Sequence, residues 1–185
     1  MPRWWYAVVV VTACAGDPGS DEDEDDDEDT AADDTGSVVV EDGRLFINEF
    51  MASNGSWTLD DDDAEATPDW VELYNASSFD VDLTGFSLTD DLDEPSKAIL
   101  GPLLLPAGGH LLLFADGEEG SRHLPFKLDA DGDALGLYDP EGQPLDRITF
   151  GGQLSDAAAG RAPDGGELGL LPEPTPGEPN PTELL

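Results

Sequence analysis

Basic residues are scarce in this chain. Its 185 residues include 7 lysines and arginines against 43 aspartates and glutamates, so the formal net charge is −36. A surface of this charge repels the phosphates of DNA and RNA, and we therefore expect no nucleic-acid partner. The single cysteine, Cys14, excludes an internal disulfide bond and a zinc site built from paired cysteines. No apolar run approaches the roughly 20 residues that a membrane-spanning helix needs.

Residues suited to catalysis are also few. Only His110 and His123 are available as a histidine base, and no Gly-x-Ser-x-Gly nucleophile motif occurs. His110 begins an apolar run and His123 lies in a polar loop, so we expect structural roles for both. Carboxylates are so numerous that chance pairs of them are weak evidence for a glycosidase. The sequence predicts a protein that is not an enzyme and has no catalytic residue.

The amino terminus has the order of a secretory signal. Arg3 is followed by an apolar run over residues 4–11 and then by small residues, which predicts a signal peptide over residues 1–13. The run Val11-Thr12-Ala13-Cys14 resembles a bacterial lipobox, and this resemblance implies that Cys14 becomes the lipidated first residue of the mature chain. Two or more acyl chains on this residue would anchor the protein stably to a membrane. The alternative is a buried strand with a core cysteine, but the sequence after Cys14 does not continue a fold.

The residue after the cysteine bears on localisation. In families with a retention rule, an aspartate directly after the lipidated cysteine holds the protein at the inner membrane. Ala15 stands there instead. The resemblance therefore favours an exported bacterial lipoprotein of the outer membrane or cell surface.

Residues 14–43 carry the lipidated cysteine and an acidic tether. Within them, residues 15–34 contain 12 acidic residues and no basic one. Such a segment cannot bury enough apolar area to offset its ordering entropy, so we expect disorder. Repulsion between like charges would extend it. The functional alternative to a solvated spacer is weak binding of cations.

From residue 44 onward, short apolar runs alternate with turn residues. Val71 and Leu73 share one face of a strand, while Glu72 and Tyr74 share the other. No window shows a sustained helical period. Many short strands at this spacing predict an all-β fold, an antiparallel sandwich or barrel. The candidate strands are residues 45–50, 70–75, 86–89, 110–115, 134–138 and 145–150.

Short motifs follow one another in a specific order across this region. They are Ile47-Asn48-Glu49, Asp69-Trp70-Val71-Glu72-Leu73-Tyr74-Asn75, Leu83-Thr84-Gly85-Phe86, Leu105-Pro106-Ala107-Gly108-Gly109, Leu137-Tyr138-Asp139, Gly160-Arg161-Ala162-Pro163-Asp164-Gly165 and Thr175-Pro176-Gly177-Glu178-Pro179-Asn180. In this order they resemble the bacterial lamin tail domains. The resemblance implies an immunoglobulin-like antiparallel β-sandwich over residues 44–181, followed by a short tail over 182–185.

The resemblance also suggests a kind of function. Lamin tail domains are non-catalytic modules, and in bacteria they occur on exported proteins or beside hydrolase domains. We therefore expect a lipid-anchored, exported protein that displays the sandwich for protein interaction or surface architecture, with a protein partner still to be identified. One alternative is a calcium-dependent adhesion or cation-binding module that uses aspartate-rich loops. A weaker one is an accessory to a separately encoded hydrolase.

The sharpest candidate for a metal site is the segment from Asp129 to Asp133. The alternating Asp129, Asp131 and Asp133 could turn several carboxylates toward one calcium ion. The glycine and glutamate of an EF-hand loop are not at the required positions. The simpler interpretation is a hairpin turn in which Gly132 adopts a positive φ. No cofactor other than this calcium ion is expected.

One basic residue has an expected structural partner. Arg161 belongs to the Gly160-Arg161 pair that resembles the family pattern. We expect it to form a structural ion pair with Glu49 or Glu72.

Overall fold

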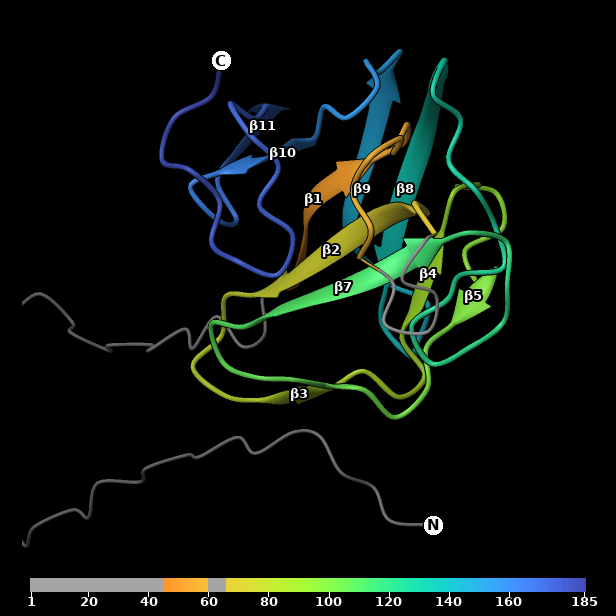
Figure 1. Ribbon diagram of the computed structural model, residues 1–185. Helices are drawn as coiled ribbons and strands as arrows, with labels where there is room; N and C mark the ends of the chain where they lie inside the picture. The colour runs from red at the N-terminus through yellow and green to blue at the C-terminus, as the bar shows by residue number, and fades with distance from the viewer. Residues whose placement is uncertain (1–44, 60–65) are drawn as a thin grey trace, which may run out of the picture. The chain divides into compact units, whose positions relative to one another are not determined.

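The computed structural model describes residues 45–59 and 66–185, and every regular element in them is a β-strand (Figure 1). The predicted signal peptide, Cys14 and the acidic tether lie outside the described residues. No helix in the described part of the chain is long and apolar enough to cross a membrane. The strands are β1 (Leu45–Met51), β2 (Asp69–Asn75), β3 (Val81–Asp82), β4 (Ser87–Thr89), β5 (Ala98–Ile99), β6 (Leu104–Leu105), β7 (His110–Ala115), β8 (Gly132–Tyr138), β9 (Pro144–Gly151), β10 (Ala159–Ala162) and β11 (Glu167–Leu170).

The strands form two main layers. A five-stranded sheet has the order β11-β10-β1-β2-β7, and a four-stranded sheet has the order β5-β4-β8-β9. The short strands β3 and β6 pair separately, and every pairing between named strands is antiparallel. The immunoglobulin-like antiparallel β-sandwich expected from the sequence is confirmed.

The main core lies between the two sheets. Along β2, Val71 and Leu73 belong to this core, as the alternating pattern predicts. Leu88 of β4 and Leu135 and Leu137 of β8 face them from the four-stranded sheet. Burial of this inner face holds the two sheets together.

A second apolar cluster covers the opposite, outer face of the five-stranded sheet. It includes Met51, Trp70 and Phe114, whose neighbours along each strand point into the main core. Leu171 and Leu184 pack in this cluster from residues 171–185, which we call the C-terminal strap. The five-stranded sheet is therefore buried on both faces, and the strap supplies part of the outer cover.

A β-bulge in β1 decides which side chains reach that outer face. Ile47 pairs with Leu73, but Glu49 pairs with Glu72, so Asn48 is the extra residue. Without this shift, Glu49 would stand opposite Val71, a residue of the main core. The bulge therefore places Glu49 on the outer face, directly opposite Glu72.

Each of the six predicted strands corresponds to an observed one within about two residues at either end. The five strands that were not predicted are β3, β5, β6, β10 and β11. The expected hairpin turn at Asp129–Asp133 was wrong, because no strand directly precedes the turn to pair with β8. Residues 126–128 form no strand, and β8 pairs instead with β4 and β9. The positive φ of Gly132 is confirmed at 132°.

Candidate functional site

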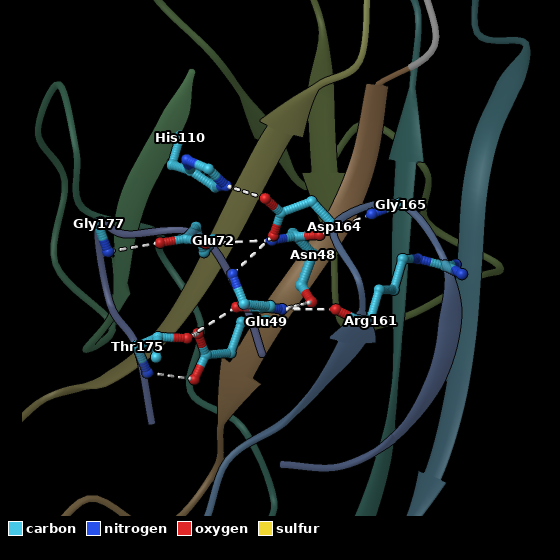
Figure 2. A network of polar contacts seen from close by, with 10 residues as sticks. Asn48, Glu49, Glu72, His110, Arg161, Asp164, Gly165, Thr175 and Gly177 are labelled. Carbon is cyan, nitrogen blue, oxygen red and sulfur yellow. Dashed lines mark hydrogen bonds and ion pairs between the residues drawn. The ribbon is translucent and has the colours of Figure 1, made fainter. Parts of the chain in front are cut away.

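Two glutamates on neighbouring strands form the centre of a buried polar network (Figure 2). Glu49 of β1 and Glu72 of β2 are both fully buried and stand opposite each other in the antiparallel pairing. Like charges directly opposite across a sheet are destabilising. This arrangement therefore needs compensating partners, or a proton.

The C-terminal strap supplies hydrogen-bond partners for both carboxyl groups. The Thr175 N–H donates to Glu49 Oε1 at 2.9 Å, and the Thr175 hydroxyl lies 2.9 Å from Glu49 Oε2. The Gly177 N–H donates to Glu72 Oε2 at 2.6 Å. The two glutamates therefore attach the strap to the middle of the five-stranded sheet.

Two asparagines extend the network. The Asn48 side-chain amide donates to Asp164 Oδ1 at 2.9 Å and lies 3.4 Å from Glu72 Oε1. The Asn180 side-chain amide donates to the carbonyls of Asn48 and Arg161 at 3.1 and 2.9 Å. The Asn180 N–H donates to Asp164 Oδ1 at 2.8 Å. The bulge residue of β1, the turn after β10 and the strap are thereby joined.

His110 closes one side of the network. Its Nε2 lies 3.2 Å from Asp164 Oδ2, and its ring stacks on Tyr74 with centroids 5.0 Å apart. Its side chain is only 7% exposed. These contacts agree with the structural role expected for this histidine.

Burial changes the acidity of the two glutamates. Loss of hydration disfavours the charged form and raises the pKa of Glu49 to about 7, although the hydrogen bond from the Thr175 N–H acts in the opposite direction. The same desolvation raises the pKa of Glu72 to about 8, opposed by the Gly177 N–H and reinforced by the nearby charge of Glu49. The pair therefore binds protons near neutral pH, unlike ordinary carboxylates.

The expected partners of Arg161 require a correction. Its guanidinium does not pair with Glu49 or Glu72. Its Nη2 lies 2.9 Å from Asp146 Oδ1 and 3.0 Å from Oδ2. Figure 2 shows the side chain turned away from both glutamates. The reason is the register of β1 and β10: Gly160, and not Arg161, stands opposite Glu49, so Arg161 projects from the other face of the sheet, where Asp146 of β9 is within reach.

Arg161 and Asp146 together complete the hydrogen bonding at this bulge. Arg161 Nε donates to the Ile47 carbonyl at 3.1 Å, and Asp146 Oδ2 accepts the Ile47 N–H at 3.0 Å. Arg161 Nη1 also donates to the Gly166 carbonyl at 2.9 Å. The pair satisfies main-chain groups that the bulge removes from the ladder.

The aspartates of the predicted calcium loop make local turn contacts. Asp129 Oδ1 accepts the Asp131 N–H at 2.9 Å, and Asp133 Oδ2 accepts the Asp129 N–H at 3.0 Å. These are the main-chain bonds by which aspartates commonly shape turns. Calcium binding at Asp129, Asp131 and Asp133 stays a prediction.

One group of potential metal ligands in the described residues was not expected from the sequence. Ligand atoms of Asp116, Glu118 and His123 lie within 4.8 Å of one another. His123 Nδ1 and Asp116 Oδ2 are already hydrogen-bonded at 2.6 Å, and Glu118 is exposed. The spacing of these three residues in the sequence does not indicate a metal site, because they come together only where the loop folds back on the end of β7.

An apolar groove opens on the surface beside the edge of the five-stranded sheet. Its exposed walls include Leu154 and Leu170, which are 75% and 43% exposed. Phe150 of β9, Ala157 and Ala159 complete the apolar lining. In so acidic a protein, this groove is a surface on which apolar contact with a partner is available.

Fold and motifs together define an immunoglobulin-like sandwich domain with a buried acidic centre. The family model described as Lamin Tail Domain matches residues 40–152, more than half of the chain, and the chain belongs to this family of non-enzymatic domains. No curated protein matches the chain. The match ends before β10, so β10, β11 and the strap fall outside it. They nevertheless supply Arg161, Thr175 and Asn180 to the network.

Proposed function

We propose that this protein is a lipid-anchored, exported protein that displays its lamin tail domain for protein interaction. The lipid anchor is Cys14, and the acidic segment that follows it is the spacer between membrane and domain. The proposal rests on the sequence for the anchor and on the family for the non-catalytic character of the domain.

The observation that carries the interaction role is the apolar groove. Leu154 is 75% exposed, and Leu170, the last residue of the edge strand β11, lines the same groove and is 43% exposed. Exposed apolar patches of this kind mark interaction surfaces more often than isolated apolar residues do. The buried glutamates, in contrast, are closed to any substrate in this conformation.

Site-specific crosslinking tests this role. A photo-crosslinking residue is placed at Leu154, and at the exposed Glu141 in the turn before β9 as a matched control. We expect a discrete crosslinked partner from position 154 that is absent from position 141, and loss of it in the variant Leu170→Asp. Identical crosslinking from both positions would contradict a role for the groove.

The anchor has its own test. The variant Cys14→Ser should lose acyl labelling and leave the membrane fraction, while Ala15→Ser, which keeps the cysteine, should retain both. Membrane attachment of the Cys14→Ser protein would show that the anchor lies elsewhere.

A further inference from the structure

The hydroxyl of Thr175 faces two oxygen atoms but has only one proton. It lies 2.9 Å from Glu49 Oε2 and 2.8 Å from Asn180 Oδ1. The orientation of the Asn180 amide is fixed, because its nitrogen donates to two main-chain carbonyls. Asn180 Oδ1 can therefore only accept a hydrogen bond.

Only one placement of protons gives every oxygen of this group a hydrogen-bond partner. The Thr175 hydroxyl donates to Asn180 Oδ1, and Glu49 Oε2 donates a proton of its own to Thr175 Oγ1. Glu49 Oε1 still accepts the Thr175 N–H. If Glu49 were ionised, the two acceptors would compete for one hydroxyl proton, and one buried oxygen would lose its partner.

The charges around Glu49 favour the protonated form. Glu72 faces it from β2, Asp164 lies nearby in the turn after β10, and the strap itself brings no base to the pair. The guanidinium of Arg161 on β10 is directed to Asp146 of β9, and His110 of β7 lies against Asp164. In agreement, burial raises the pKa of both glutamates.

We propose that Glu49 and Glu72 form a proton-dependent latch, which holds the C-terminal strap while the pair retains a proton and releases it when both carboxyls ionise. Release would withdraw Leu171 and Leu184 from the outer apolar cluster and uncover Trp70. The latch is independent of the lipid anchor and of the groove, so it stands or falls separately from the proposed function.

Amide hydrogen exchange of the full-length protein measures how firmly the strap is held at each pH. Protection of the Thr175 and Gly177 amides is compared with that of β8 at each pH, which cancels the intrinsic pH dependence of exchange. Between pH 6 and pH 9 we expect relative protection of the strap to fall by about tenfold or more. The reason is that each pH unit above the pKa of a latch carboxyl lowers the equilibrium constant for holding the strap by up to a factor of about ten. Unchanged relative protection over this range would overturn the latch.

The variant Glu49→Gln separates the latch from general alkaline loosening. The glutamine amide can donate to Thr175 Oγ1 at every pH, as the protonated acid does, so relative strap protection should become nearly independent of pH. Glu167→Gln on β11 removes the same charge from an exposed position and should behave like the parent protein. A Glu49→Gln strap as sensitive to pH as that of the parent would contradict the mechanism.

A direct measurement on the unaltered protein covers the case in which the variant fails to fold. The carboxyl carbons of Glu49 and Glu72 are followed by NMR as pH is raised. We expect both to titrate well above the ordinary glutamate value of 4.5. A midpoint near 4.5 for both would eliminate the proton on which the latch depends.

Discussion

At the scale of single residues, the bulge in β1 depends on one arginine. Arg161 contacts Asp146, the Ile47 carbonyl and the Gly166 carbonyl, and its side chain is only 16% exposed. Its contacts lie at the junction of β1, β9 and β10, and not at the buried glutamates with which an ion pair was expected.

Replacing Arg161 with alanine should lower the free energy of unfolding by about 2–4 kcal/mol. The change leaves the Asp146 carboxylate largely buried without its cation and deprives two carbonyls of a donor. Urea denaturation followed by circular dichroism measures the loss. Arg147→Ala, at an exposed position of β9, is the control and should cost less than about 1 kcal/mol. An unchanged midpoint for Arg161→Ala would show that this junction does not depend on the ion pair.

A glycine lets the strap approach the sheet. A Cβ atom on Gly160 would lie 2.7 Å from Leu171 Cδ1, 2.9 Å from Asn180 Nδ2 and 2.9 Å from the Asn48 carbonyl. Gly160→Ala should therefore destabilise the protein by about 1–3 kcal/mol through overpacking. Gly151→Ala is the matched control, because a Cβ there meets no atom within 4 Å. Equal melting temperatures for the two variants would argue against close packing of the strap.

Calcium binding by the aspartate loop is a separate prediction at the scale of single residues. If Asp129, Asp131 and Asp133 bind it, millimolar calcium should raise the melting temperature beyond the effect of magnesium at the same ionic strength. The shift should disappear in Asp131→Asn. Equal shifts with the two cations would identify only charge screening by a very acidic protein.

At the scale of elements, the strands of six or more residues and the short β4 were predictable, whereas β3, β5, β6, β10 and β11 were not. β2 and β7 carry alternating or continuous apolar residues, and the sequence pattern places them correctly. β10 reads Ala-Gly-Arg-Ala and β11 reads Glu-Leu-Gly-Leu, so neither has enough apolar alternation to be detected. Long-range pairing with β1, rather than local propensity, makes β10 a strand.

The site was predictable only in part for a related reason. Glu49, Glu72 and Arg161 stand out in the motifs, but which of them meet depends on the register of β1. The single-residue shift at Asn48 turns the Glu49 side chain to the other face of the sheet, and no local feature of the sequence indicates this shift. Thr175 and Asn180 were within a recognised motif, yet their contacts span more than a hundred residues.

The elements beyond residue 152 should be essential to the domain. A chain ending there lacks β10, which occupies one side of β1, and lacks every strap donor to the buried glutamates. We expect it to show no cooperative thermal transition, whereas residues 44–185 should unfold cooperatively. Calorimetry distinguishes the two. A sharp transition in the shorter chain would show that the domain folds without β10 and β11.

At the scale of the whole molecule, the buried pair predicts an unusual pH dependence. Both glutamates have a higher pKa when folded than the ordinary 4.5, so their contribution to stability is complete below pH 4.5 and is lost as pH rises through about 7 and 8. The free energy of unfolding should fall over this range by up to about 1.4 kcal/mol per pH unit for each ionising carboxyl.

Chemical denaturation between pH 5 and pH 9 checks this slope. The double variant Glu49→Gln, Glu72→Gln should flatten it, while Glu141→Gln with Glu167→Gln, which removes equal charge from exposed positions, should not. A slope common to both double variants would assign the pH dependence to general repulsion in the acidic chain.

The distance along the chain between the two halves of the latch has a consequence for synthesis. Glu49 and Thr175 are 126 residues apart, so a growing chain exposes β1 on the order of ten seconds before its last partners exist. Non-local pairing of this kind also slows folding itself. The sheet therefore cannot close around its acidic centre until residues near 175 have been made.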